Sequence, residues 1–137
     1  MIDLKEWFEP EYQYRLENVS FFSFEEEAGK EFVSRFFDTI DYEMDNQTLK
    51  ARYTRRIQFE PKGILDIKVS FVITMRFKDE LPGEISDLTK ELDDALQDTK
   101  CPYVAAVAAK ASILISQLTI ASGQNPIVTQ PTFLKAE

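Results

Sequence analysis

The sequence contains no histidine, one cysteine and only four glycines among 137 residues. Histidine is the usual general base near neutral pH, so acid–base catalysis would depend on carboxylates held in a dry pocket. The single cysteine excludes an intramolecular disulfide, and Cys101, directly before Pro102, is interpreted as a small residue at a helix boundary. Patterns typical of dinucleotide, P-loop and zinc sites are absent as well. We therefore expect a protein that is not an enzyme and that has no cofactor and no metal site.

Positive charge is in short supply, since 16 basic residues face 24 acidic ones and give a net charge of −8 at pH 7. Such a chain repels phosphate backbones, so nucleic acid is not an expected partner. The first residues, MIDLKEWFEP, contain neither the basic nor the apolar part of a secretory signal. With a single cysteine, this start predicts a cytoplasmic protein.

Four segments alternate between apolar and polar residues and are predicted to be strands: residues 12–21, 32–44, 48–59 and 65–77. In the first, the alternation changes parity near Glu17 and Asn18, which predicts a β-bulge. Short connections between the segments favour an antiparallel meander. A turn at Asp45 and Asn46 would place Tyr42 opposite Leu49, with a charge pair beside them.

Two helices follow the strands. Residues 85–96 have apolar positions at helical spacing, which indicates an amphipathic helix that covers the sheet. Pro102 and Gly123 bound a second segment in which Lys110 is the only charged residue. A membrane span is one interpretation of this run, but its alanines, serines and central lysine favour a soluble helix buried on two sides, without membrane insertion.

Two-sided burial of that helix would require its own sheet on one side and another copy of the chain on the other. A homo-oligomer, either a dimer or a tetramer, is therefore expected. The candidate interface residues are Val107, Ala111, Leu114 and Leu118. After Gly123, Pro126 and Pro131 should hold the chain extended, so that Ile127, Val128 and Phe133 pack back as a brace.

Residues 115–133 read ISQLTIASGQNPIVTQPTF and resemble the ending of the SecB family of export chaperones, I-S-x-L-T … G-x-x-P-ϕ-ϕ-x-x-x-P … F, where ϕ is apolar. Upstream, Cys101-Pro102 resembles the C-P that opens the same region, and ENVSF at residues 17–21 resembles the family's first-strand K-D-ϕ-S-F. The order of elements matches over nearly the whole chain. Residues 1–137 are thus interpreted as a single SecB-like domain of the α+β class, a four-stranded antiparallel meander followed by an amphipathic helix, a long apolar helix and an extended tail that contains proline.

This resemblance implies a chaperone that holds unfolded polypeptides in hydrophobic grooves without ATP, as a dimer of dimers, and passes them to the motor SecA. Aromatic residues gather around the first two strands and could line such a groove, although each could instead fill the core. The candidate groove residues are Phe21, Phe22, Phe24, Phe36, Phe37 and Tyr103.

Some positions depart from the family pattern. Asn18 and Phe22 replace the acidic residues that flank ϕ-S-F, and Arg76 and Lys78 stand where the family offers an acidic contact. These departures place SecA docking in doubt and suit a divergent relative, such as the uncharacterised proteins of this fold in Gram-positive bacteria or the chaperones attached to toxin–antitoxin systems. The leading function from the sequence is a holdase with unfolded or partly folded clients, and the alternative is an adaptor with one specific partner. A third, a small-molecule binding protein or enzyme, would need a deep polar pocket with convergent carboxylates.

Overall fold

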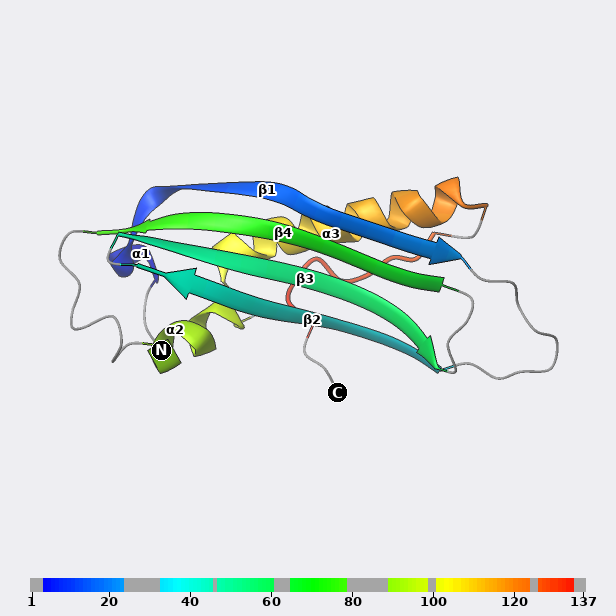
Figure 1. Ribbon diagram of the computed structural model, residues 1–137, viewed down its shortest axis with the longest axis horizontal. Helices are drawn as coiled ribbons and strands as arrows, with labels where there is room; N and C mark the ends of the chain where they lie inside the picture. The colour runs from blue at the N-terminus through cyan, green and yellow to red at the C-terminus, as the bar shows by residue number, and fades with distance from the viewer. Residues whose placement is uncertain are drawn as a thin grey trace.

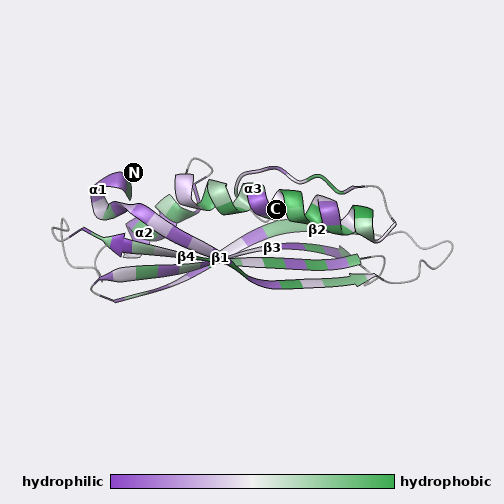
Figure 2. Cartoon of the chain, turned by 90° about the horizontal axis from the view of Figure 1, so that it is seen from above, coloured by the Kyte–Doolittle hydropathy of each residue, from purple (hydrophilic) through white to green (hydrophobic). Residues whose placement is uncertain are grey.

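A computed structural model describes residues 4–23, 33–45, 47–60, 65–78, 89–98, 101–123 and 126–134. Its elements are α1 (Leu4–Trp7), β1 (Phe8–Ser23), β2 (Val33–Met44), β3 (Thr48–Glu60), β4 (Leu65–Phe77), α2 (Thr89–Leu96) and α3 (Pro102–Ala121). The strands form one antiparallel sheet (Figure 1), and the helices lie on one side of it (Figure 2). We call this the helix side of the sheet and the opposite side the open side. The predicted α+β class and four-stranded antiparallel sheet are confirmed.

The order of the strands in the sheet is β1-β4-β3-β2. Strands β2, β3 and β4 form the expected meander, but β1 pairs with β4, so the predicted meander is wrong for the first strand. The two central strands are the ones with the most buried positions, and the polar, exposed β1 takes an edge. The strands with the most buried residues are thus the central ones, as expected for a sheet with one covered side.

The bulge predicted in β1 is present. Leu16 lies opposite Phe71 and Asn18 opposite Ser70, which leaves Glu17 as the extra residue. Because a bulge shifts the alternation by one residue, Leu16 and Val19 both face the helix side. The bulge thus keeps the apolar residues of both halves of β1 on one side of the sheet.

The hairpin between β2 and β3 forms, but its register differs from the prediction by two residues. Tyr42 lies opposite Ala51 rather than Leu49, and Met44 lies opposite Leu49. The Asp45 carboxylate accepts hydrogen bonds of 2.7 Å from the backbone N–H groups of both Gln47 and Thr48, which fixes the turn one residue later. A shift of two residues preserves the parity of every position, so the predicted faces were right although the pairs were wrong.

The core lies between the helix side of the sheet and α3. The eight buried residues of α3 are Tyr103, Val104, Val107, Ala108, Ala111, Ser112, Ile115 and Thr119. By length and composition alone α3 could cross a membrane, yet here it packs these residues on the sheet.

Helix α2 buries Leu92, Ala95 and Leu96, as its amphipathic pattern predicts, whereas Ile85 and Leu88 lie outside the described residues. Gly123 has a φ of 87°, and it ends the region of α3 as predicted.

Replacement of Asp45 by alanine should lower the melting temperature by a few degrees, because two backbone N–H groups of the turn lose their acceptor. Asp45→Asn, which keeps an acceptor oxygen, should recover part of the loss. The two backbone hydrogen bonds also hold the pKa of Asp45 below its ordinary value of 3.8. The stabilisation should therefore be complete above pH 3.8 and disappear as the pH falls through the folded pKa. Equal melting temperatures for wild type and Asp45→Ala at pH 7 would contradict this role of the turn.

Candidate functional site

The predicted groove residues do not lie on one surface. Phe21 pairs with Ile67 and Phe36 with Ile57, and these four residues form one row across the helix side. Phe21 packs against the core from the β1 edge, while Phe36 is 41% exposed at the β2 edge. Phe21 and Phe36 therefore lie at opposite edges of the sheet, although both face the helix side.

Phe22 and Phe37 point to the open side, because each directly follows a residue that faces the helices. Phe22 is 58% exposed, and the Arg35 guanidinium lies 5.9 Å from the centroid of the Phe37 ring. The charged residues around them are arranged in pairs, such as Arg56 with Asp66 at 3.4 Å. A single groove lined by Phe21, Phe22, Phe36 and Phe37 is thus incompatible with the alternation of the strands.

Tyr103 lies at the other end of the sheet, where α3 begins. Its ring packs edge-on against Tyr12, with centroids 4.9 Å apart, and against Phe8 at 6.2 Å. It is almost completely buried, so it belongs to the core and not to a groove surface. Phe24, the remaining candidate, lies outside the described residues.

Reactive groups are scarce in the part of the chain that the structure describes. Burial raises the pKa of the Cys101 thiol, which disfavours the nucleophilic thiolate. Among the described residues, no group of three His, Cys, Asp or Glu side chains could hold a metal ion.

The candidate interface residues of α3 also separate into two groups. Val107 and Ala111 are fully buried against the chain's own sheet, so they have no surface to offer a second copy, and their assignment needs correction. Leu114 and Leu118 are half-buried, and for them the interface stays a prediction. The exposed apolar residues of α3 are instead Ile113 (60%) and Ile120 (55%), which lie seven residues apart on its outer side. We call these two residues the outer ridge.

An apolar surface extends along β1 next to α3. On the helix side of β1, Tyr14, Leu16 and Val19 are 41%, 48% and 37% exposed. The Lys110 ammonium group lies 5.4 Å from the centroid of the Tyr14 ring, which brings this flank of α3 beside β1. Because β1 and α3 run in the same direction (Figure 1), residues four and eight positions after Lys110 continue this flank of α3 along β1. Those residues are Leu114 and Leu118, and the apolar strip is defined as Tyr14, Leu16, Val19, Leu114 and Leu118.

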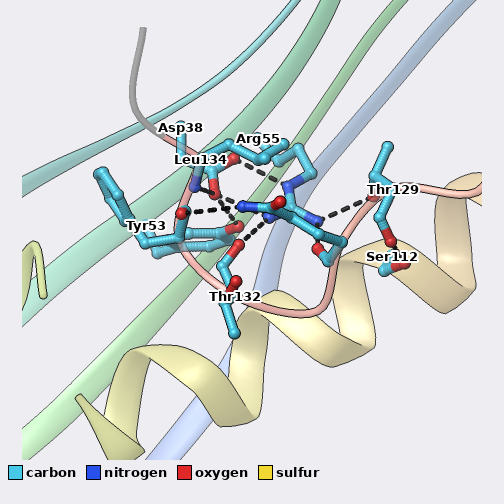
Figure 3. Close-up of polar contacts among 9 residues, drawn as sticks. Asp38, Tyr53, Arg55, Ser112, Thr129, Thr132 and Leu134 are labelled. Atoms are coloured by element: carbon cyan, nitrogen blue, oxygen red, sulfur yellow. Dashed lines mark hydrogen bonds and ion pairs between the residues drawn. The ribbon is translucent and has the colours of Figure 1, made fainter. Parts of the chain in front are cut away.

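The other flank of α3 borders a buried ionic cluster. Arg55 of β3 and Asp38 of β2 lie opposite each other and have no exposed side-chain surface. Two parallel hydrogen bonds of 2.8 Å join the guanidinium to the carboxylate, and the Tyr53 hydroxyl donates to Asp38 at 2.7 Å (Figure 3). Two charges can be buried together only if the rest of their hydrogen-bonding capacity is satisfied.

Residues 126–134, which we call the strap, provide the remaining hydrogen-bond partners of this ion pair. Arg55 donates to the carbonyl oxygens of Gln130 and Thr132 at 2.6 and 2.7 Å and to the hydroxyl of Thr129 at 2.8 Å. Asp38 accepts from the backbone N–H of Leu134 at 2.8 Å. Every N–H group of the Arg55 guanidinium therefore donates either to Asp38 or to the strap.

The electrostatics of the cluster favour the ion pair. Burial, the largest single influence, would lower the pKa of Arg55, but its hydrogen bonds and electrostatic interactions with Asp38 and Tyr53 together outweigh burial and raise that pKa. Burial and the Asp38 charge raise the pKa of Tyr53, so its phenol remains a hydrogen-bond donor. Both shifts favour the protonated forms of Arg55 and Tyr53, which are the forms that donate hydrogen bonds to Asp38.

The brace predicted for the tail is correct in part. Phe133 is buried beside Tyr53, with ring centroids 6.4 Å apart, and Ile127 packs against the core. Val128 is 77% exposed, so its predicted packing is wrong.

The sequence contained a signal for the ionic cluster that the prediction did not use: Arg55 and Asp38 are charged residues at inward-facing positions of their strands.

No protein-family model and no curated protein sequence matches the chain. Among solved structures, the fold is similar to that of the Mycobacterium tuberculosis SecB-like chaperone Rv1957, which was solved in complex with a ChAD peptide from the Rv1956 HigA1 antitoxin. The TM-score is 0.59 at 9% sequence identity, and the match covers 87% of this chain and 88% of that chain. The chain therefore has a SecB-like fold.

The buried pair can be tested against an exposed one. Asp38→Ala should lower the free energy of unfolding by about 3–5 kcal/mol, because it leaves the Arg55 charge buried without its partner. Glu17→Ala, which breaks the exposed 2.6 Å pair with Arg52, should cost far less. Urea unfolding at pH 7 measures both. An Asp38→Ala loss no larger than that of Glu17→Ala would show that the cluster is not a structural anchor.

Proposed function

We propose that this protein is a SecB-like chaperone that holds non-native polypeptides without ATP. The observation that carries the proposal is the apolar strip, which is exposed on a chain with a SecB-like fold. Contiguous exposed apolar side chains on a soluble protein favour binding of another apolar surface. Side chains of several shapes in the strip suit clients that differ in sequence.

The proposal assigns self-association to a different part of α3. The outer ridge lies on the side of α3 that faces away from the sheet, so a second copy could pack there without covering β1. A homo-oligomer formed through the ridge would leave two or more apolar strips available to one extended client, which raises its avidity.

Delivery to SecA is not part of the proposal. The exposed Arg76 lies on the open side of β4, where the resemblance would require acidic residues. A cytoplasmic location remains an expectation from the sequence, and it suits a protein that meets newly made chains.

A double substitution in the strip tests the holdase function. Leu16→Glu with Val19→Glu should abolish the delay that the wild type imposes on aggregation of heat-unfolded citrate synthase at equimolar ratio, since two charges would replace the apolar contacts. The matched control is Phe22→Glu with Val33→Glu, which changes two exposed apolar residues on the open side. We expect the control to act as the wild type. Equal loss in both variants would argue against the strip, and no delay by the wild type would argue against a holdase.

A second candidate function is an adaptor for one defined partner. The observation in its favour is that the similar chaperone was solved with a peptide from one antitoxin. Pull-down from the native source would distinguish the two functions: a single dominant partner supports the adaptor, and many unrelated partners support the holdase.

A further inference from the structure

We infer that the channel now filled by the strap is a binding site for an extended polypeptide segment, and that the strap is its resident occupant. The channel is formed by β2, β3 and the flank of α3 that faces away from the apolar strip. Its walls carry Asp38, Arg55 and Ser112, which Figure 3 labels, and Thr119.

The channel recognises the main chain of its occupant. Four strap carbonyl oxygens accept hydrogen bonds from the walls, and two strap N–H groups donate to them. The carbonyls of Thr129, Gln130, Thr132 and Leu134 are bonded by Ser112 Oγ (2.5 Å), Arg55 (2.6 and 2.7 Å) and the Asp38 N–H (2.8 Å). The N–H groups of Ile127 and Leu134 donate to Thr119 Oγ1 (2.9 Å) and Asp38 Oδ2 (2.8 Å). Bonds to main-chain atoms can form with any extended segment, whatever its side chains.

Only two side chains of the strap are buried. Thr129 is 5% exposed and bonds to Arg55, and Phe133 is 4% exposed and packs on Tyr53. Val128, Gln130 and Pro131 are exposed. The channel therefore selects a hydroxyl residue followed four positions later by an aromatic one, and tolerates variety between them.

The strap belongs to neither a helix nor a strand, so it can leave the channel without breaking the hydrogen bonds of either. If it leaves, Arg55 and Asp38 gain access to water, which replaces the lost hydrogen bonds. A competing segment with the same two side chains would restore all of them. The resident strap competes at the high effective concentration of a tethered segment, so the wild type should bind a free segment only weakly.

This site is separate from the apolar strip and does not depend on holdase activity. Its ligand class is narrower, because a pattern of one hydroxyl and one aromatic residue is required. The strap sequence itself is the natural probe.

The test uses the full chain with a weakened strap and a fluorescein-labelled peptide, PIVTQPTFL, that reproduces residues 126–134. Phe133→Ala should bind this peptide about 100-fold more tightly than the wild type in fluorescence anisotropy, because its own strap has lost its aromatic anchor. The matched control variant is Val128→Ala, which changes an exposed strap residue and should bind as weakly as the wild type. A control peptide with alanine in place of its phenylalanine should not bind the Phe133→Ala variant.

Equal affinities of the wild type and Phe133→Ala for the peptide would overturn the proposal. A measurement on the wild type covers the case in which Phe133→Ala does not fold. In hydrogen exchange, the Ile127 and Leu134 amides should exchange at least about 10-fold faster than the backbone amides of β3 that pair with β4, which reports local opening of the strap. Exchange of strap and sheet amides at the same rate would show that the strap opens only when the whole protein unfolds, and would overturn the proposal as well.

Discussion

The buried pair of Arg55 and Asp38 is the constraint on which the rest of the structure depends. Neither residue has any exposed side-chain surface, and a lone buried charge would cost several kilocalories per mole. The pair alone cannot satisfy five guanidinium N–H groups, so two main-chain oxygens and the Thr129 hydroxyl from residues 126–134 complete the set. Because these residues come after α3, the sheet can bury its central charges only when the helix and the strap are both in place. The ionic cluster thus joins β2 and β3 to the strap, which lies about 75 to 96 residues later in the sequence.

This requirement makes the two flanks of α3 unequal. Ser112 and Thr119, seven residues apart, face the strap and bond to its main chain. The opposite flank carries Lys110, Leu114 and Leu118, and it has no strap to cover it. An apolar surface is therefore left beside β1 because the polar flank of the helix is the one that the strap occupies. The exposed strip is a consequence of where the buried charges lie.

The alternation of residues predicted the strands, their faces and the β-bulge at Glu17, because burial on one side of a sheet imposes a period of two. It could not determine the register of the hairpin, since a shift of two residues leaves every face unchanged. The correct register is the one that places Asp38 opposite Arg55, the two charged residues at inward positions. The order of strands was also beyond local patterns, because the position of β1 depends on which strands the helices cover. A search for charge pairs at inward positions would have corrected the register but not the strand order.

The prediction of a groove failed for a related reason. Phe21-Phe22 and Phe36-Phe37 look like one aromatic cluster in the sequence, but adjacent residues of a strand point to opposite sides. Residues that share a surface must share parity within a strand, allowing for a bulge, as Tyr14, Leu16 and Val19 do. None of these three stood out, because each is separated from the next by polar residues. A binding surface on a sheet is therefore found by following parity along an edge strand, and local enrichment in aromatic residues points instead to both sides of the sheet at once.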